Sequence, residues 1–138
     1  MWILLGLSCS NPSGNNRALP KYPSISLQIN AVDITVGYAS LPHETSLGLR
    51  YRDLGPDDGL LMKVSKGQFS MEEMKQPLSI ALISSDGAIE NFWDMDINSE
   101  PNQLPEETAF LLEMTLGWFV RHDIIKDMKV IGLPENNE

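Results

Sequence analysis

The chain lacks several features that would assign a function directly. Cysteine occurs once, as Cys9, so no intrachain disulfide can form. Ten Lys and Arg stand against nineteen Asp and Glu, which gives a formal net charge of −9. Runs of Lys and Arg are missing, and binding to the phosphate backbone of a nucleic acid depends on such clusters. The sequence therefore argues against a nucleic-acid-binding protein.

Recognisable catalytic and cofactor motifs are also missing. No Gly-x-Ser-x-Gly segment occurs, and Cys9 lies outside the expected domain, which excludes a Cys–His pair within it. After residue 9, no segment approaches the roughly 20 apolar residues of a membrane-spanning helix. We therefore assign no catalytic residue and expect no cofactor.

The N-terminal segment is apolar and ends in small residues before the only cysteine. It resembles the end of a bacterial lipoprotein signal, in which Cys9 would be acylated after cleavage behind Ser8. The usual Lys/Arg-rich region is missing and Gly6 stands where Leu is common, so a fortuitous apolar tail is the alternative. Residues 10–23 are rich in Pro, Gly, Asn and Ser, which predicts a flexible linker. We expect an extracytoplasmic protein, periplasmic or at the cell surface, attached to a membrane through acylated Cys9.

Residues 24–133 predict one domain, followed by a solvated tail over 134–138. Apolar and polar residues alternate in several segments, as in half-buried strands. The parity of the apolar positions changes near Asn30-Ala31, where we expect a turn or bulge, and Asp86-Gly87 suits a hairpin turn. Strands are expected near 25–29, 32–38, 60–64, 78–83, 88–93, 110–114 and 129–133, and short helices near 42–51 and 116–122. Roughly seven or eight short strands without a βαβ rhythm predict a mainly β fold, a small antiparallel sandwich or barrel of jelly-roll type with two short helices.

Short motifs follow one another in a fixed order between Ile34 and Val130. They are Gly48-Leu49, Arg52, Asp57–Leu61, Phe69, Met71, Pro77-Leu78, Ile80-Ala81, Asp86-Gly87, Leu111–Met114 and Gly117-Trp118. This order resembles the bacterial and archaeal domain-of-unknown-function family 192, whose biochemical role is unassigned. The resemblance implies the fold class and implies no particular activity.

The polar part of the family pattern differs in this chain. Family members usually carry Phe-Trp-Met-Lys-Asn-Thr and, after a short gap, Pro-Leu-Asp-Ile. Here Ser70, Glu72, Glu73 and Met74 replace Trp, Lys, Asn and Thr, while Ser79 replaces Asp and Asp123 replaces a Gly in the C-terminal turn. The retained residues are mostly structural, so the resemblance implies a kept scaffold with an altered polar cluster.

Arg52 is the polar residue that best matches the family. Its guanidinium suits a carboxylate or another anion, although we favour an ion pair with Asp57, Asp58 or Glu113 that ties the helix exit to the sheet. Glu113 interrupts an apolar strand and is either solvated or, if buried, paired with Arg52. The candidate ligand-binding residues are Arg52, Asp57, Met71, Glu73 and Glu113.

Two metal sites can be imagined from composition. Glu72 and Glu73, with Asp94 and Asp96, supply oxygen atoms for calcium, but the Asp/Asn-Gly rhythm of a dedicated loop is missing. His43 and His122 accompany six methionines that would suit copper, although core filling is their ordinary role. These methionines are Met62, Met71, Met74, Met95, Met114 and Met128. We assign no metal-binding residue.

The leading functional hypothesis is a non-catalytic, extracytoplasmic domain that binds an unidentified small molecule or protein. One alternative is a small hydrolase that uses Arg52 with Glu72, Glu73 or Glu113. The other alternative is a periplasmic metal-binding protein.

Replacing Cys9 by Ser tests the predicted anchor. If Cys9 is acylated, the C9S variant loses its attachment point and should move from the membrane fraction to the soluble fraction of a bacterial host. Incorporation of radiolabelled palmitate should disappear with it. Ser10→Ala serves as the control and should stay membrane-bound. Membrane association of C9S equal to that of the parent chain would contradict the anchor.

Overall fold

The computed structural model describes residues 22–64 and 68–135, and it confirms the mainly β fold with two short helices. Cys9 lies outside the described residues. The strands are β2 (Ser24–Ile29), β3 (Val32–Ala39), β4 (Gly59–Lys63), β5 (Gln68–Phe69), β6 (Leu78–Ser84), β7 (Ile89–Met95), β8 (Asn102–Gln103), β9 (Thr108–Thr115) and β10 (Val130–Ile131). The helices are α2 (Pro42–Leu47) and α3 (Trp118–Arg121).

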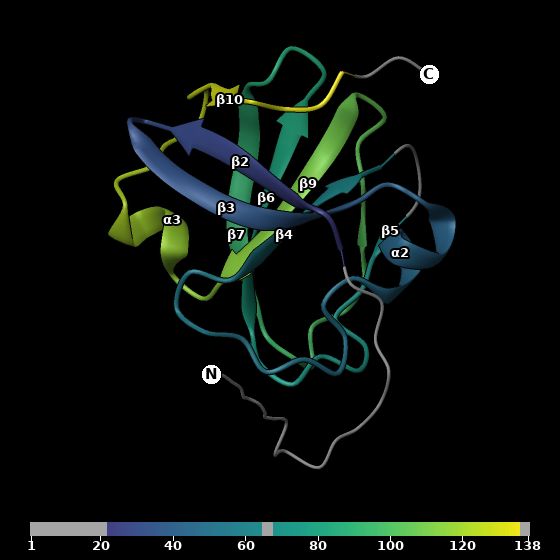
Figure 1. Ribbon diagram of the computed structural model, residues 1–138. Coiled ribbons are helices and arrows are strands. Elements are labelled where there is room, and N and C mark those ends of the chain that lie inside the picture. Colours follow the sequence, from purple (N-terminus) through teal and green to yellow (C-terminus); the bar gives the residue numbers. More distant parts are fainter. Residues whose placement is uncertain (1–21, 65–67, 136–138) are drawn as a thin grey trace, which may run out of the picture.

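Seven strands form one curled sheet in the order β10-β2-β3-β4-β9-β6-β7, and β5 pairs with β8 in a small second sheet (Figure 1). β3 and β4 run parallel, whereas the other paired strands run antiparallel. The expected antiparallel architecture thus holds except at this one pair of the described strands. The reason is the connection, because the chain leaves β3 through α2 and returns to start β4 from the same end.

The two predicted turns are confirmed. Asn30 and Ala31 join β2 to β3 with φ angles of 52° and 64°, the positive values that two-residue hairpin turns require. The turn from β6 to β7 contains Gly87 with a φ angle of 90°, a conformation that glycine adopts without steric cost. The Asp86 carboxylate accepts a hydrogen bond from the Ala88 N–H, which closes the turn.

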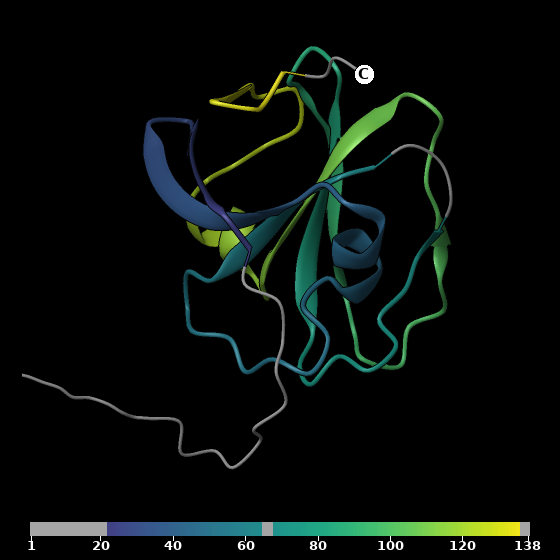
Figure 2. The same cartoon turned by 45° about the vertical axis from the view of Figure 1, so that its right-hand side comes forward.

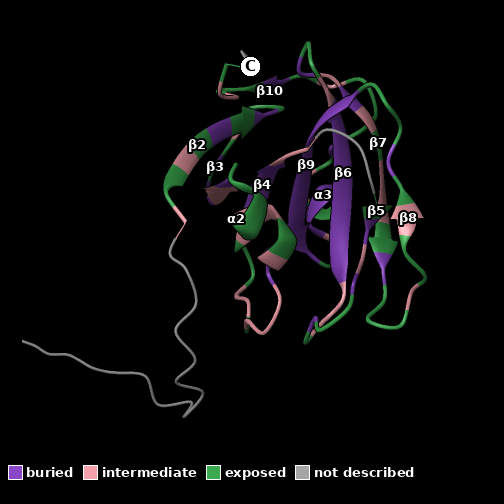
Figure 3. Ribbon diagram, turned by 90° about the vertical axis from the view of Figure 1, so that its right-hand side faces the viewer, coloured by how far each residue is buried: buried purple, intermediate pink, exposed green. Residues whose placement is uncertain are grey.

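Both faces of the central sheet are covered (Figure 3). One buried cluster, the Trp118 core, contains Leu112, Met114, Trp118 and Phe119. The other, the Phe69 core, contains Leu49, Phe69, Met71, Met74 and Leu111. Figures 1 and 2 show α3 and α2 on opposite sides of the sheet. Strand β9 is therefore buried along all of Thr108–Thr115.

Tyr22 and Pro23 already contact the domain. The Tyr22 hydroxyl donates a hydrogen bond to the Gly48 carbonyl oxygen at 2.6 Å, and the Tyr38 N–H donates to the Pro23 carbonyl oxygen at 2.8 Å. The segment before β2 is thus held against β3 and the exit of α2.

Replacing Gly59 by Ala tests whether the close approach of β4 and β9 requires glycine at this position. A methyl group at this position would lie 2.7 Å from the Glu113 carbonyl oxygen and would collide with the Met114 sulfur. Gly59→Ala should lower the free energy of unfolding by about 1–3 kcal/mol, because the strand backbone cannot move aside without breaking its pairing. The measurement is urea unfolding followed by circular dichroism.

Gly55 in the preceding turn supplies the matched control for Gly59. Its added methyl group would meet only the Asp58 carboxylate, at 3.4 Å. Gly55→Ala should therefore change stability by less than about 0.5 kcal/mol. Equal losses in the two variants would contradict the steric argument.

A candidate binding pocket around Glu113

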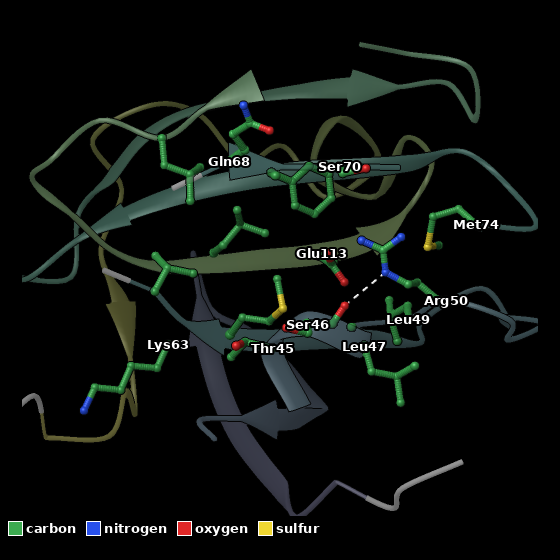
Figure 4. A pocket seen from close by; sticks show the side chains of 16 residues that line it. Thr45, Ser46, Leu47, Leu49, Arg50, Lys63, Gln68, Ser70, Met74 and Glu113 are labelled. Carbon is green, nitrogen blue, oxygen red and sulfur yellow. Dashed lines mark hydrogen bonds between the residues drawn. The ribbon is translucent and has the colours of Figure 1, made fainter. Parts of the chain in front are cut away.

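A cavity of about 400 Å³ lies on the side of the sheet that faces α2. It is bounded by the end of α2 and the loop after it, by β4, by β5 with the segment that follows, and by β9 (Figure 4). The lining residues are Thr45, Ser46, Leu47, Gly48, Leu49, Arg50, Met62, Lys63, Val64, Gln68, Phe69, Ser70, Met74, Leu104, Leu111 and Glu113. Its volume falls in the range of small-molecule sites.

Glu113 is the buried polar group of this cavity. It sits in the middle of β9 with 2% of its surface exposed, and its Oε1 atom has no hydrogen-bond partner among the described residues. Burial raises the pKa of the carboxyl group from 4.5 to about 8, and the positive charge of Arg50 acts in the opposite direction without offsetting burial. At neutral pH the carboxyl group is therefore mostly protonated.

Gly48 allows the exit of α2 to lie against this carboxyl group. Its φ and ψ angles are 53° and −134°, a combination open almost only to glycine. An added Cβ atom would stand 3.7 Å from Glu113 Oε1. The Tyr22 hydroxyl holds the Gly48 carbonyl oxygen from the other side, so the loop is fixed where it closes the cavity.

Arg50 lies on the cavity wall and is held there by the main chain. Its Nε donates a hydrogen bond to the Ser46 carbonyl oxygen at 3.0 Å (Figure 4), and its Nη1 donates to the Glu72 carbonyl oxygen. Sequence reasoning passed over Arg50 because it matches no family motif. Its spacing from the helix could have predicted this contact, since an Arg four residues after Ser46 can reach a free carbonyl oxygen at the helix end.

The five predicted site residues separate in the structure. Glu113 lines the cavity, and Arg52 lies outside it with its guanidinium carbon 5.1 Å from the centre of the Tyr22 ring. Asp57 accepts a hydrogen bond from the Trp118 indole N–H at 3.1 Å. Met71 is buried in the Phe69 core, and Glu73 is exposed. Arg50, which the sequence did not single out, is a cation that acts on Glu113.

The carboxylate and histidine candidates for a metal site do not gather in the described part of the chain. No group of three or more His, Cys, Asp or Glu side chains there is placed to hold a metal ion. Met62, Met71, Met74, Met95 and Met114 are buried in the two cores. His122 stacks on Trp118 with ring centres 4.2 Å apart. The methionines thus fill the core, as we interpreted them.

Comparison with protein families decides the relationship. The family model of DUF192, described as an uncharacterised group, matches residues 25–132. The chain belongs to DUF192. The match confirms the resemblance drawn from the motifs between Ile34 and Val130 and extends it to β2 and β10. No curated protein matches the chain.

Two solved structures share the fold of this DUF192 domain. One, from Sinorhizobium meliloti 1021, is described as a candidate transcription regulator. It has a TM-score of 0.75 and 23% identity over 83% of this chain and 98% of its own. The other is a protein of unknown function from Novosphingobium aromaticivorans DSM 12444. Its TM-score is 0.67, with 20% identity over 79% of this chain and 84% of its own. At such identities these likenesses establish the fold alone.

One further structural finding concerns membranes. The helices in the described residues are all too short or too polar to span a bilayer.

The raised pKa of Glu113 predicts an unusual dependence of stability on pH. The folded state holds the proton up to about pH 8, whereas the unfolded carboxyl group loses it near pH 4.5. The folded state therefore binds more protons between these values, and this group's contribution to stability falls as pH rises. Below the unfolded pKa the contribution is fully present, and above about pH 8 it is lost.

Glu113→Gln isolates this effect because the amide keeps the shape and cannot ionise. Between pH 5.5 and 7.5, the free energy of unfolding of the parent chain should fall relative to E113Q by up to about 1.4 kcal/mol per pH unit. Urea unfolding at several pH values measures the difference. Parallel pH profiles for the two proteins would show that Glu113 has an ordinary pKa.

Proposed function

We propose that this DUF192 protein is a non-catalytic domain that binds a small molecule in the cavity around Glu113. The observation that carries the proposal is the buried carboxyl group in a space of about 400 Å³, whose Oε1 atom has no hydrogen-bond partner within residues 22–64 and 68–135. A buried polar atom without a hydrogen bond costs free energy in the empty protein. A ligand that donates a hydrogen bond to Glu113 removes this cost, so binding is favoured.

The lining of the cavity supports binding more than hydrolysis. Glycosidase-type hydrolysis requires two carboxyl groups on either side of the scissile bond. Glu113 is the one acid among the described lining residues, and Arg52, Glu72 and Glu73 lie outside the lining. Of the residues in the hydrolase hypothesis, the described cavity lining thus contains Glu113 alone. The arrangement of His, Asp and Glu side chains in the described chain gives the metal-binding hypothesis no support either.

We also propose that the domain works outside the cytoplasm, tethered through acylated Cys9. The support is the apolar segment that ends at Cys9 and the Pro- and Asn-rich segment after it. The regulator role given to the Sinorhizobium meliloti protein is not carried over. The net charge of −9 and the missing basic clusters disfavour contact with DNA.

A fragment screen tests whether the cavity binds ligands. Compounds of up to about 15 non-hydrogen atoms suit a pocket of this size, and ligand-observed NMR detects their weak binding. Met74 lines the cavity with 9% of its surface exposed, so Met74→Trp fills the space with a larger side chain. Fragments that bind the parent protein should bind M74W at least about tenfold more weakly.

Met128 provides the control for this screen because it packs against the Trp118 core, away from the cavity. Met128→Trp introduces the same side chain, and the cavity hits should keep their affinity. A screen without hits, or hits that bind M74W and the parent protein equally well, would overturn the proposed function. Thermal unfolding of both variants shows that they remain folded.

A further inference from the structure

The cavity presents two ionisable groups that can act on a single ligand. The Glu113 carboxyl group lies at the buried end, and the Arg50 guanidinium lies on the wall formed after α2. Figure 4 shows these two groups pointing toward one another. The rest of the lining is mixed. Apolar walls are formed by Leu49, Met62, Phe69, Met74, Leu104 and Leu111, and polar side chains are interspersed among them.

We propose that the cavity takes a small zwitterion of the α-amino acid class with an apolar side chain. The ammonium group would bind the Glu113 carboxylate, the ligand carboxylate would face Arg50, and the side chain would contact the apolar walls. This inference rests on the proposed function and names its ligand class.

The state of Glu113 favours an ammonium group. An ammonium carries three N–H donors, and Glu113 Oε1 is a buried acceptor without a partner. A charge-assisted hydrogen bond to a buried carboxylate is stronger than a neutral one. The ammonium also replaces the proton that Glu113 holds in the empty cavity, so the buried carboxyl group stays electrically compensated.

Arg50 selects for a second, negative group on the same ligand. Two of its donors are used by the Ser46 and Glu72 carbonyl oxygens, and a guanidinium has five N–H donors in all. The remaining donors suit a carboxylate. A ligand with a positive charge alone would be repelled by Arg50, whereas a zwitterion satisfies both groups and adds no net charge to the cavity.

The apolar walls of the cavity determine which side chain the ligand can carry. Six lining side chains, named above, are apolar. Lys63 on β4 adds a positive charge, and the uncharged polar side chains are Thr45, Ser46, Gln68 and Ser70. A branched or thioether side chain gains from leaving water against such walls. A charged side chain would lose its hydration there without a partner, so leucine and methionine suit the space better than aspartate or lysine.

Proton release gives this binding mode a signature. The charged and titratable groups around Glu113 are Arg50 and Arg52 after α2, Lys63 on β4 and Tyr22 before β2. Burial raises the pKa of Tyr22, so its hydroxyl stays neutral. Glu113 must therefore supply the proton that is released when an ammonium binds. Affinity should rise with pH up to about 8, where the free carboxyl group ionises.

Isothermal titration calorimetry with L-leucine and two analogues tests the ligand class. Isoamylamine lacks the carboxylate, and 4-methylpentanoate lacks the ammonium group. L-leucine should bind at least about tenfold more tightly than either analogue. At pH 6.5, titration in buffers of different ionisation enthalpy should reveal the release of close to one proton per leucine bound.

Matched variants separate the two ends of the ligand. Glu113→Gln should weaken leucine binding at least about tenfold and abolish proton release. Arg50→Gln should bring the affinity for leucine down to that for isoamylamine. Arg121→Gln is the control, because Arg121 is exposed on α3 and does not line the cavity, and leucine binding should not change.

The outcomes distinguish the ligand class from the proposed function. One outcome is that fragments bind the parent protein and lose affinity in M74W while leucine does not bind. In that case the cavity is a binding site, and the proposed zwitterionic ligand class is wrong. If leucine binds no more tightly than isoamylamine, Arg50 does not bind the ligand carboxylate, and the inference is overturned. Binding without proton release would leave Glu113 protonated and would also overturn it.

Discussion

The burial of β9 on both faces is the constraint on which the rest of the structure depends. The strand lies between β4 and β6, and all eight of its residues are buried. Leu112 and Met114 enter the Trp118 core, while Leu111 enters the Phe69 core. Because successive side chains alternate between faces, Glu113 must share the face of Leu111. A carboxyl group at this position cannot reach bulk water without breaking the centre of the sheet.

The two covers of the sheet differ in kind, and the cavity follows from this difference. On one side, Trp118 and Phe119 of α3 pack directly on the strands, both with at most 1% of their surface exposed. On the other side, α2 contributes no buried residue, and the cover consists of side chains from loops and short strands, such as Leu49, Phe69 and Leu104. Such irregular segments cannot interdigitate as regularly as a helix on a sheet. The unfilled space lies where they meet β9, above Glu113.

Local signals predicted the fold well, and long-range contacts account for what they missed. Asp86-Gly87 and the parity change at Asn30-Ala31 fixed two turns, because both depend on neighbouring backbone angles. Alternation also placed Glu113 opposite Leu112, but it could not tell that the second face is covered. Arg50 escaped notice for the same reason. It follows α2 in a loop without periodicity, and only the packing of that loop on β9 brings it to the cavity of Glu113.

The departures from the DUF192 pattern fall into two groups once the structure is known. Ser79 lies away from the cavity, where its hydroxyl donates to Asp94 at 2.5 Å and accepts from the Gly117 N–H at 2.8 Å. The carboxylate that the family pattern places at position 79 is thus supplied here from the neighbouring strand, and the link to α3 is kept.

Positions 70 and 74, in contrast, line the cavity. Ser70 stands where the family pattern has Trp, which removes a large ring from the lining, and Met74 replaces Thr, which removes a hydroxyl group. The first change leaves space in the lining, and the second leaves one hydroxyl group fewer that could donate a hydrogen bond. A buried carboxyl group is costly without a hydrogen-bond partner, so the space left at position 70 and the hydroxyl missing at position 74 favour a partner from outside the chain.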